Sequence, residues 1–522
     1  MGWWLDIFQA MFFVYGITLL SMYALLAFLS LRGVKRFKAE SDFVDYENAF
    51  HSSIVPGISV IAPAFNEGVT IIMNVRSLLT LDYPEFEVII VNDGSTDNTL
   101  DLLISEFEME EVPFAYDEKI ITRPVKRLFK SANPAYSRLL VVDKVNGKSK
   151  ADASNAGINA AAFDYFLCTD VDCILEKDTL LKMIKPFLDE DSGKLKPVGE
   201  ACPKCGYAEV VGGGAGVIGE ACPECGYVDM AEEGVRVIAS GATLRLVNSC
   251  EVSGGMITRV RAPRQWLPRF QEMEYIRAYV LGKMGWSQIN CVPNVSGGLG
   301  LFDKEIAIKA GGYDAKSFAE DMDIVTRMCT YMIENKLKYT IRYIPSSQCW
   351  TEGPSSLKVF GRQRTRWGRG LAEIMVMHKK VLFNPRYGRL GLVVMPYNFL
   401  FEFLAPIIEL LGIGSYIYLI LSGQLNWSFA LILLAFAYLY AVMISTLALL
   451  WDQLTFRYYK TWQEVMGLSL MAFIEPLVYH PMIVFFALKG YFNFATGRKH
   501  TWGNMQRQGF GQPQQKTATP SS

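Results

Sequence analysis

Apolar residues concentrate near both ends of the chain, and a long stretch of mixed composition lies between them. Residues 7–31 are almost all apolar and carry no charge. Hydrophobic runs return at residues 390–421, 427–450 and 465–492. About 20 apolar residues are enough for a helix to cross a bilayer. The pattern therefore predicts an N-terminal transmembrane helix within residues 1–34 and further membrane helices within residues 388–494.

Charged residues beside these runs predict how the chain is oriented. Four basic residues directly follow the first run: Arg32, Lys35, Arg36 and Lys38. Basic flanks favour the cytosolic side of a membrane, so residues 55–380 are expected to form a cytosolic domain. The runs at 390–421 and 427–450 then cross outward and back. We therefore expect a multi-pass protein of the plasma or inner membrane.

The last apolar run, residues 465–492, leaves two arrangements open. Pro476 and Pro481 interrupt this run, and proline kinks or ends a helix. A single crossing would place the basic tail, residues 495–522, outside the cell. A kinked, re-entrant or interfacial element would keep that tail in the cytosol, and this is the arrangement we expect.

Two acidic residues, Glu402 and Glu409, lie within an apolar run. A charge at membrane depth is costly and usually faces protein or water. Either these carboxylates form hydrogen bonds between neighbouring helices, or they line a polar passage.

The middle of the chain contains short apolar runs that alternate with helical patterns. Strands are predicted at residues 58–63, 86–91, 139–142 and 165–169, and helices at residues 69–81 and 151–162. Strands that alternate with helices form parallel sheets covered on both faces. The fold class predicted for this part is therefore α/β and Rossmann-like. Ligands bind such sheets at the carboxyl ends of the strands.

Polar loops follow the first three predicted strands. Asp93 lies just after the second strand, where its carboxylate can accept hydrogen bonds from a base or a ribose. Lys148 precedes the helix at residues 151–162. Because a helix N-terminus favours an anion, Lys148 is expected to neutralise a phosphate. A polar loop with an ordinary helix cap is the alternative interpretation of residues 92–98.

Asp170 and Asp172 come directly after the fourth predicted strand. Alternate residues of a strand share one face, so both carboxylates are expected to point into one site. Carboxylate oxygens suit Mg²⁺ or Mn²⁺, with further ligands supplied by phosphates. Such a metal ion would neutralise a leaving diphosphate.

Three motifs occur in a fixed order: PAFNE at 63–67, VNDGSTDNT at 91–99 and GKSKADASNAG at 147–157. Together they resemble family 2 glycosyltransferases of the GT-A fold, over a region from about residue 56 to 369. The resemblance implies that the first two motifs hold the nucleotide of a sugar donor. It makes the following residues donor-binding: Pro63, Ala64, Asn66, Glu67, Asp93 and Asp170. Asn92 stands where some members of the family have a second Asp.

Glu320 and Asp321 precede a helical pattern at residues 324–332 and resemble the acidic motif of the same family. The resemblance implies that Asp321, with Glu320 beside it, accepts the proton of the acceptor hydroxyl. Acidic residues also simply stabilise a helix N-terminus. Ala319 stands where many members have Thr.

Gly297 and Gly298 lie in the segment VSGGLGLF, which resembles the acceptor-side loop of the family. Glycine lets the backbone approach a ligand closely. A glycine-rich turn without a ligand is the alternative interpretation of this segment.

The string QRTRW at residues 363–367 matches the Q-x-x-R-W signature of synthases of cellulose, chitin, hyaluronan and poly-N-acetylglucosamine. We expect Arg364 and Arg366, with Gln363, to bind the donor diphosphate. The ring of Trp367 offers a surface on which an acceptor sugar can stack. A basic helix lying against anionic lipid is the alternative. The resemblance implies a processive enzyme.

The leading hypothesis is an inverting, membrane-bound glycosyltransferase that uses a UDP-sugar to extend a β-linked glycan and export it. Its partners would be the donor, the growing glycan, the bilayer and an accessory export or regulatory subunit. Two alternatives stay open: a non-processive transferase acting on a lipid-linked acceptor, and a non-catalytic membrane scaffold with a degenerate transferase domain. The net charge of −1 gives no basic field for nucleic acid.

Residues 197–232 contain two nearly identical segments, each with the string CPxCGY. The four cysteines are Cys202, Cys205, Cys222 and Cys225. Two C-x-x-C pairs at this separation are typical of a Cys₄ zinc ribbon. We expect structural Zn²⁺ here, since zinc replaces a core too small to fold alone. A docking site for a partner subunit is the alternative role of this segment.

Freshly purified protein is expected to contain about one zinc ion per chain, because four thiolates at this spacing close a tetrahedral site. Elemental analysis measures the ion directly. The double variant Cys202→Ser/Cys205→Ser should lose it. Wild-type protein without zinc would rule out the zinc ribbon.

Overall fold

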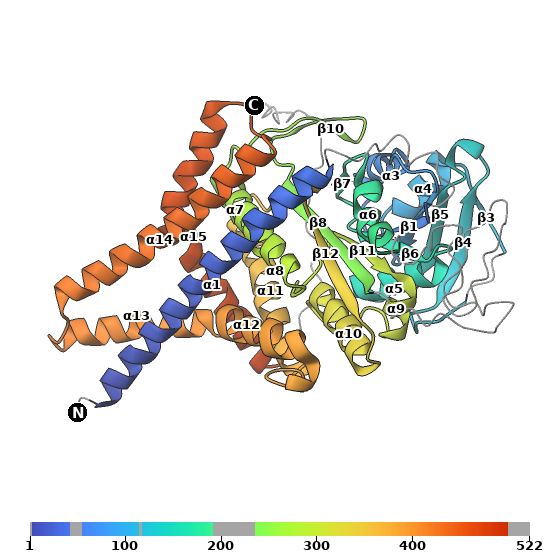
Figure 1. The fold of residues 1–522 in the computed structure, drawn as a ribbon. Helices are drawn as coiled ribbons and strands as arrows, with labels where there is room; N and C mark the ends of the chain where they lie inside the picture. The colour runs from blue at the N-terminus through green and yellow to red at the C-terminus, as the bar shows by residue number, and fades with distance from the viewer. Residues whose placement is uncertain (1–2, 42–54, 114–116, 192–234, 499–522) are drawn as a thin grey trace, which may run out of the picture.

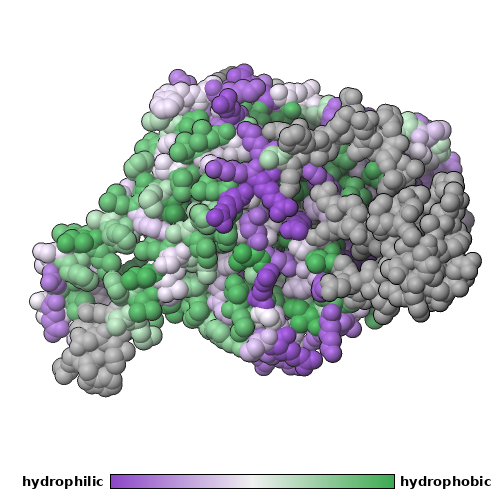
Figure 2. Space-filling model, in the orientation of Figure 1, coloured by the Kyte–Doolittle hydropathy of each residue, from purple (hydrophilic) through white to green (hydrophobic). Residues whose placement is uncertain are grey.

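The computed structural model describes residues 3–41, 55–113, 117–191 and 235–498. A sheet domain lies on one side of the molecule, and long apolar helices extend from the other (Figure 1). Hydrophobic side chains cover much of the surface of these helices (Figure 2). The structure therefore contains the two parts that the apolar runs predicted, a domain of mixed composition and a set of apolar helices.

Ten strands form one sheet in the order β3-β4-β5-β2-β1-β6-β11-β8-β12-β7. Its centre is parallel, since β1 pairs with β2 and β6, and β2 pairs with β5. These four are the strands predicted from the sequence: β1 (Ile58–Ala64), β2 (Phe86–Asn92), β5 (Leu139–Lys144) and β6 (Tyr165–Thr169). All four are almost fully buried, as continuous apolar runs in a covered parallel sheet require.

The four predicted strands are parallel as expected, but the complete sheet is mixed. Strand β11 runs antiparallel to both β6 and β8, and β4 runs antiparallel to β5. The strands that the sequence pattern missed are β3 (Met109–Glu111), β4 (Val125–Ser131), β7 (Ile174–Leu175), β8 (Arg236–Leu246), β11 (Leu299–Asp303) and β12 (Tyr339–Thr351). A separate hairpin joins β9 (Glu251–Ser253) to β10 (Met256–Arg259).

Helices of the sheet domain include α5 (Lys150–Ala160), which matches the predicted small-residue helix and packs on β1 and β2. A Cβ added at Gly157 would lie 2.3 Å from the Ile61 side chain, so only glycine permits this approach. The other helices are α3 (Ile71–Leu79), α4 (Thr99–Glu106), η1 (Pro134–Tyr136), α6 (Thr179–Asp191), α9 (Lys304–Lys309) and α10 (Glu320–Glu334).

A second group of helices lies between the sheet and the apolar helices. It contains α7 (Trp266–Ile276), the π-helical segment η2 (Arg277–Lys283), α8 (Met284–Gln288) and α11 (Leu357–Met377), followed by the short turn η3 (Pro385–Tyr387). The first three are continuous along the chain and contact α1 and α14, while α11 packs along α15. This group therefore connects the two parts of the molecule.

Among the residues that the structure describes, four helical segments are long and apolar enough to cross a membrane: Ala10–Ala39, Leu390–Leu421, Trp427–Thr455 and Trp462–Ala495. The first segment corresponds to α1 (Trp3–Ser41). The second consists of η4 (Leu390–Val394), α12 (Met395–Tyr397), η5 (Asn398–Phe403) and α13 (Ala405–Leu421). The third and fourth are α14 (Trp427–Thr455) and α15 (Trp462–Ala495). The predicted runs at both ends of the chain are thus helical.

The last apolar run, for which a kinked, re-entrant or interfacial element was expected, forms one helix. Helix α15 runs unbroken from Trp462 to Ala495 with Pro476 and Pro481 inside it. In Figure 1 it runs from top to bottom across α14, whereas α1, α13 and α14 extend away from the sheet. The interfacial arrangement of α15 and the side on which the tail lies stay predictions.

A buried charge cluster joins β8 to α7 and α14. The guanidinium of Arg245, on β8, donates to Glu272 Oε1 on α7 at 2.8 Å and to Asp452 on α14. Tyr459 Oη donates to Glu272 Oε1 at 2.5 Å. All three charged side chains are at most 1% exposed. Charges this deep persist only when their partners stay in place.

The substitution Arg245→Met is expected to lower the free energy of unfolding by about 3–5 kcal/mol, because it leaves two buried carboxylates without their cation. Arg76→Met is the control, since the Arg76–Glu106 pair is 53% and 37% exposed and is worth at most about 1 kcal/mol. Thermal unfolding in detergent measures both. Equal midpoints for the two variants would contradict the importance of the cluster.

Candidate active site

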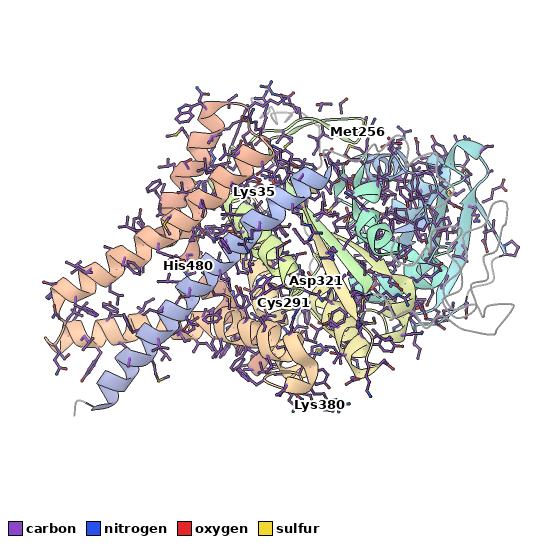
Figure 3. The ribbon with its side chains drawn as sticks, in the orientation of Figure 1. Lys35, Met256, Cys291, Asp321, Lys380 and His480 are labelled. Carbon is purple, nitrogen blue, oxygen red and sulfur yellow. The ribbon has the colours of Figure 1, made fainter. Side chains whose placement is uncertain are left out.

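A cavity of about 720 Å³ lies between the sheet domain and the apolar helices. Its walls come from the end of β6, the loop before β11, the start of α10, α11, η2, α1 and the segment 397–402. Asp321 lies near the centre of the molecule, between the sheet and the helices (Figure 3). The cavity gathers residues that are far apart in the sequence.

The two carboxylates predicted to bind metal lie together at the carboxyl end of β6. Oxygens of Asp170 and Asp172 and the sulfur of Cys173 lie within 4.8 Å of one another. Asp172 is 5% exposed, while the Asp170 side chain opens into the cavity and is 38% exposed. Two hard oxygen donors beside open space fit a divalent cation that also binds phosphate.

Lys150, the first residue of α5, lies at this pair, and sequence reasoning missed it. Its Nζ forms an ion pair with Asp170 and donates to the carbonyl oxygen of Gly297 at 2.6 Å. Burial alone would lower its pKa, but the charge of Asp170 holds the pKa of Lys150 above its usual value. Lys148, the residue chosen from the sequence, is exposed and outside the cavity lining.

The loops after β1 and β2 are held against each other at the same edge of the sheet. The Asn66 backbone N–H donates to Ser95 Oγ at 3.0 Å, and Asn66 Oδ1 accepts from the Thr96 N–H at 2.8 Å. The Glu67 N–H donates to Thr99 Oγ1 at 2.9 Å. Pro63 and Ala64 form the end of β1 that carries this loop.

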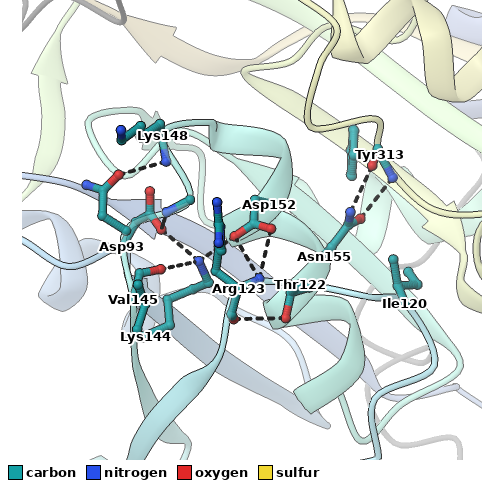
Figure 4. A network of polar contacts seen from close by, with 12 residues as sticks. Asp93, Ile120, Thr122, Arg123, Lys144, Val145, Lys148, Asp152, Asn155 and Tyr313 are labelled. Atoms are coloured by element: carbon teal, nitrogen blue, oxygen red, sulfur yellow. Dashed lines mark hydrogen bonds and ion pairs between the residues drawn. The ribbon is translucent and has the colours of Figure 1, made fainter.

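Asp93 lies in a network with Lys144 and Asp152 (Figure 4). Its Oδ1 accepts from Lys144 Nζ and from the Gly147 N–H, both at 2.8 Å. Lys144 is fully buried and also pairs with Asp152. Asp93 is 6% exposed, so its orientation is fixed before any ligand binds. These donor loops lie outside the described lining of the 720 Å³ cavity.

Asp321 lies at the start of α10 and lines the cavity. Its Oδ2 accepts from the Gly297 N–H at 3.1 Å and from Asn294 Nδ2 at 3.2 Å. Neighbouring Glu320 is 7% exposed, and burial, followed by the negative charge of Asp321, raises the pKa of Glu320. Both carboxylates line the cavity.

Gly297 and Gly298 link the metal pair to Asp321. The carbonyl oxygen of Gly298 accepts from Thr169 Oγ1 at 2.9 Å, which ties the loop to the end of β6. A Cβ added at Gly298 would lie 2.9 Å from a Leu244 methyl group. Both glycines line the cavity, so a side chain at either position would fill space beside the carboxylates.

Three residues of the QRTRW string line the cavity from α11: Gln363, Arg366 and Trp367. They are spaced i, i+3 and i+4, which places them on one face of a helix. Trp367 is 37% exposed, and its ring is open to the cavity. This face of α11 is therefore available to ligands.

Arg364 does not line the cavity, contrary to its expected contact with the diphosphate. Its guanidinium reaches α7, where Nη1 and Nη2 each donate to a carboxylate oxygen of Glu274 at 2.6 Å. The guanidinium carbon also lies 4.4 Å from the ring centroid of Trp367, its neighbour one turn along α11. Arg364 therefore packs against Trp367, and its contact with a donor stays a prediction.

The cavity continues between the apolar helices, where Tyr23, Tyr397 and Glu402 line it. Glu409 forms a hydrogen bond with another helix, because His480 Nε2 on α15 lies 2.9 Å from its carboxylate. His480 lies among the apolar helices (Figure 3). Each of the two interpretations of these carboxylates thus fits one residue. Glu402 lines a polar passage, and Glu409 joins two helices.

The predicted zinc ligands, Cys202, Cys205, Cys222 and Cys225, lie outside the described residues. The zinc ribbon at residues 197–232 therefore stays a prediction.

Two family models match the chain. Glycosyl transferase family 2 matches residues 59–195, and Glycosyl transferase family group 2 matches residues 245–452. The first match contains the donor loops and the metal pair. The second contains Asp321, the QRTRW string and part of the apolar helices. Together the matches cover more than half of the chain.

Curated relatives include poly-beta-1,6-N-acetyl-D-glucosamine synthases of staphylococci. The protein of Staphylococcus epidermidis is 25% identical over 322 residues, which cover 62% of this chain and 56% of the relative. The protein of Staphylococcus aureus strain COL is 24% identical over 358 residues, which cover 69% of this chain and 64% of the relative. The matches thus span less than two thirds of the length of either relative.

Solved structures with a similar fold include a mannosyltransferase of Pyrobaculum calidifontis in complex with GDP-Man and Mn²⁺. It is 14% identical, with a TM-score of 0.46, and the match covers 91% of this chain and 99% of that protein. Residues 1–349 of TarS from S. aureus in complex with UDP-GlcNAc are 14% identical, with a TM-score of 0.32, over 61% of this chain and 66% of that one.

The order of motifs, the GT-A-like mixed sheet and both family matches agree with the resemblance seen in the sequence. Four helices in the described part of the chain are long and apolar enough to cross a bilayer. By these two matches the chain belongs to the family 2 glycosyltransferases.

Proposed function

We propose that this protein is an inverting polysaccharide synthase that transfers N-acetylglucosamine from UDP-N-acetylglucosamine to a growing β-linked glycan. The observation that carries the proposal is the continuous cavity. It joins the metal pair and Asp321 to Trp367 and then reaches Tyr23, Tyr397 and Glu402 between the apolar helices. The names of the staphylococcal relatives support the choice of donor sugar.

The donor is held at the carboxyl edge of the sheet. The loops of Asn66 and Asp93 take the uridine. Asp170 and Asp172 would hold Mg²⁺ or Mn²⁺, which would neutralise the charge of the diphosphate. Arg366 and Gln363 on α11 approach the diphosphate from the other side. Fixed charges of this kind stabilise a leaving group without reorganising during the reaction.

Asp321 acts as the general base. Because two of its hydrogen bonds come from Gly297 and Asn294, the carboxylate is held in place while it takes the proton of the acceptor hydroxyl. The acceptor oxygen attacks the anomeric carbon as UDP leaves. A single in-line displacement inverts the configuration, so an α-linked donor gives a β-linked product.

The acceptor stacks on Trp367, and the elongated glycan leaves along the cavity toward the apolar helices. This route favours processive synthesis coupled to export, with the sheet domain in the cytosol at the plasma or inner membrane. An accessory export subunit fits the same scheme. A non-processive transferase acting on a lipid-linked acceptor would give short products, and a non-catalytic scaffold would release no UDP.

Membrane vesicles that contain the protein are expected to release UDP from UDP-N-acetylglucosamine with Mg²⁺ or Mn²⁺ and to make a polymer. Product size after digestion with linkage-specific glycosidases is the measurement, with UDP-glucose as the donor control. Products of one added sugar would exclude processivity. Polymer formed from UDP-glucose alone would overturn the choice of donor.

Asp321→Asn is expected to lower kcat by about 10²–10⁴-fold, because the amide accepts no proton in the transition state. The KM for the donor should change little, since Asp321 contacts no donor loop. Asp101→Asn, at an exposed position of α4, is the matched control and should keep full activity. If the Asp321→Asn enzyme stayed fully active, another residue would be the base.

A further inference from the structure

Lys283 is a cavity-lining cation that the mechanism above does not use. It is the last residue of the π-helical segment η2. Its Nζ lies 4.8 Å from the ring centroid of Tyr279. Among the described residues it has neither an ion pair nor a hydrogen-bond acceptor at this nitrogen. The amino group is therefore free to donate to a molecule in the cavity.

Asp321 is the charged residue whose field acts on Lys283. Burial lowers the pKa of Lys283 to about 8, and the charge of Asp321 opposes that effect. Asp321 already accepts hydrogen bonds from Gly297 and Asn294, so it is held away from direct pairing. The two charges thus belong to different walls of one cavity, on η2 and α10.

A largely buried ammonium without a partner destabilises a protein, because it loses water and gains no hydrogen bond. A nearby cation of the same chain shows how a buried charge is usually compensated. Arg277 at the other end of η2 donates to Ser445 and to Glu475, each at 2.7 Å. Among the described residues Lys283 has the Tyr279 ring beside it but no hydrogen-bond acceptor, which indicates that a ligand supplies the acceptor.

The position of Lys283 distinguishes between the two substrates. The diphosphate side of the cavity already has Lys150 beside Asp170 and Arg366 on α11. Lys283 lies instead on η2, which packs against α1 and α14, so it lines the part of the cavity toward the apolar helices. Neighbouring Trp286 and Tyr397 also line the cavity, with ring centroids 4.7 Å apart. An ammonium beside aromatic rings suits a saccharide.

We propose that Lys283 is an acceptor-binding residue whose ammonium donates hydrogen bonds to hydroxyl or carbonyl oxygens of the terminal acceptor sugar. This inference rests on the proposed function and adds a contact to it. The acceptor sugar lies between Lys283 on η2 and Asp321 on α10, with one face on Trp367. Its attacking hydroxyl is thereby directed toward Asp321.

Kinetics of Lys283→Met test the proposal in the full-length protein. With a β-1,6-linked N-acetylglucosamine pentasaccharide as acceptor, its KM for the acceptor is expected to rise about 10–100-fold, as loss of a hydrogen bond from a charged group implies. The KM for UDP-N-acetylglucosamine and the rate of donor hydrolysis without acceptor should stay within about threefold. Lys283→Arg, which keeps the charge, should recover part of the acceptor affinity.

Thermal unfolding separates this role from a structural one. Removing an unpaired ammonium should leave the midpoint of Lys283→Met unchanged or raised, because methionine fills the site without a desolvation cost. Lys177→Met, at an exposed position, is the matched control for both experiments. A lower midpoint together with equal losses toward donor and acceptor would overturn the proposal.

Binding of the pentasaccharide without donor distinguishes failure of this inference from failure of the proposed function. If wild-type protein binds the pentasaccharide and Lys283→Met does not, the inference stands even where no sugar is transferred. If transfer proceeds and the acceptor KM of Lys283→Met is unchanged, the inference is wrong and the proposed function stands. Absence of both binding and transfer would overturn both.

Discussion

Three arginine–carboxylate contacts along α7 and η2 hold the sheet domain against the apolar helices. Glu272 meets Arg245 of β8, which also reaches Asp452 of α14. Glu274 meets Arg364 of α11, and Tyr479 of α15 donates to Glu274 at 2.5 Å. Arg277 completes the series by its bonds to Glu475 of α15.

The three contacts set the shape of the cavity because all of them come from one continuous helix. Its charged residues are spaced 272, 274 and 277, so they point in different directions and reach different elements. Buried pairs of this kind lose much of their value when one partner moves. The catalytic residues on the sheet and the cavity walls on the apolar helices therefore keep a defined relation to each other.

The sequence predicted the centre of the fold and much of the site, because both depend on local patterns. Continuous apolar runs identified β1, β2, β5 and β6, and strand ends located Asp93, Asp170 and Asp172. The mixed half of the sheet was missed because β8 and β12 contain Arg, Gly, Ser and Gln, whose burial depends on distant partners such as Glu272.

The remaining differences concern the direction of single side chains. The sequence does not show whether Lys148 or Lys150 faces the site. That choice depends on where α5 begins, and the residues around the two lysines do not indicate the position. The ion pair of Arg364 could not be foreseen, because its partner, Glu274, lies 90 positions earlier in the chain. The role of Lys283 has no sequence signal, since its environment comes from η2 and α10 together.

Gly297 forms hydrogen bonds with both Asp321 and Lys150. Its N–H donates to Asp321, and its carbonyl oxygen accepts from Lys150, which in turn pairs with Asp170. The metal pair and Asp321 are thus connected through the N–H and the carbonyl oxygen of one residue. The backbone conformation at Gly297 therefore sets the separation between them.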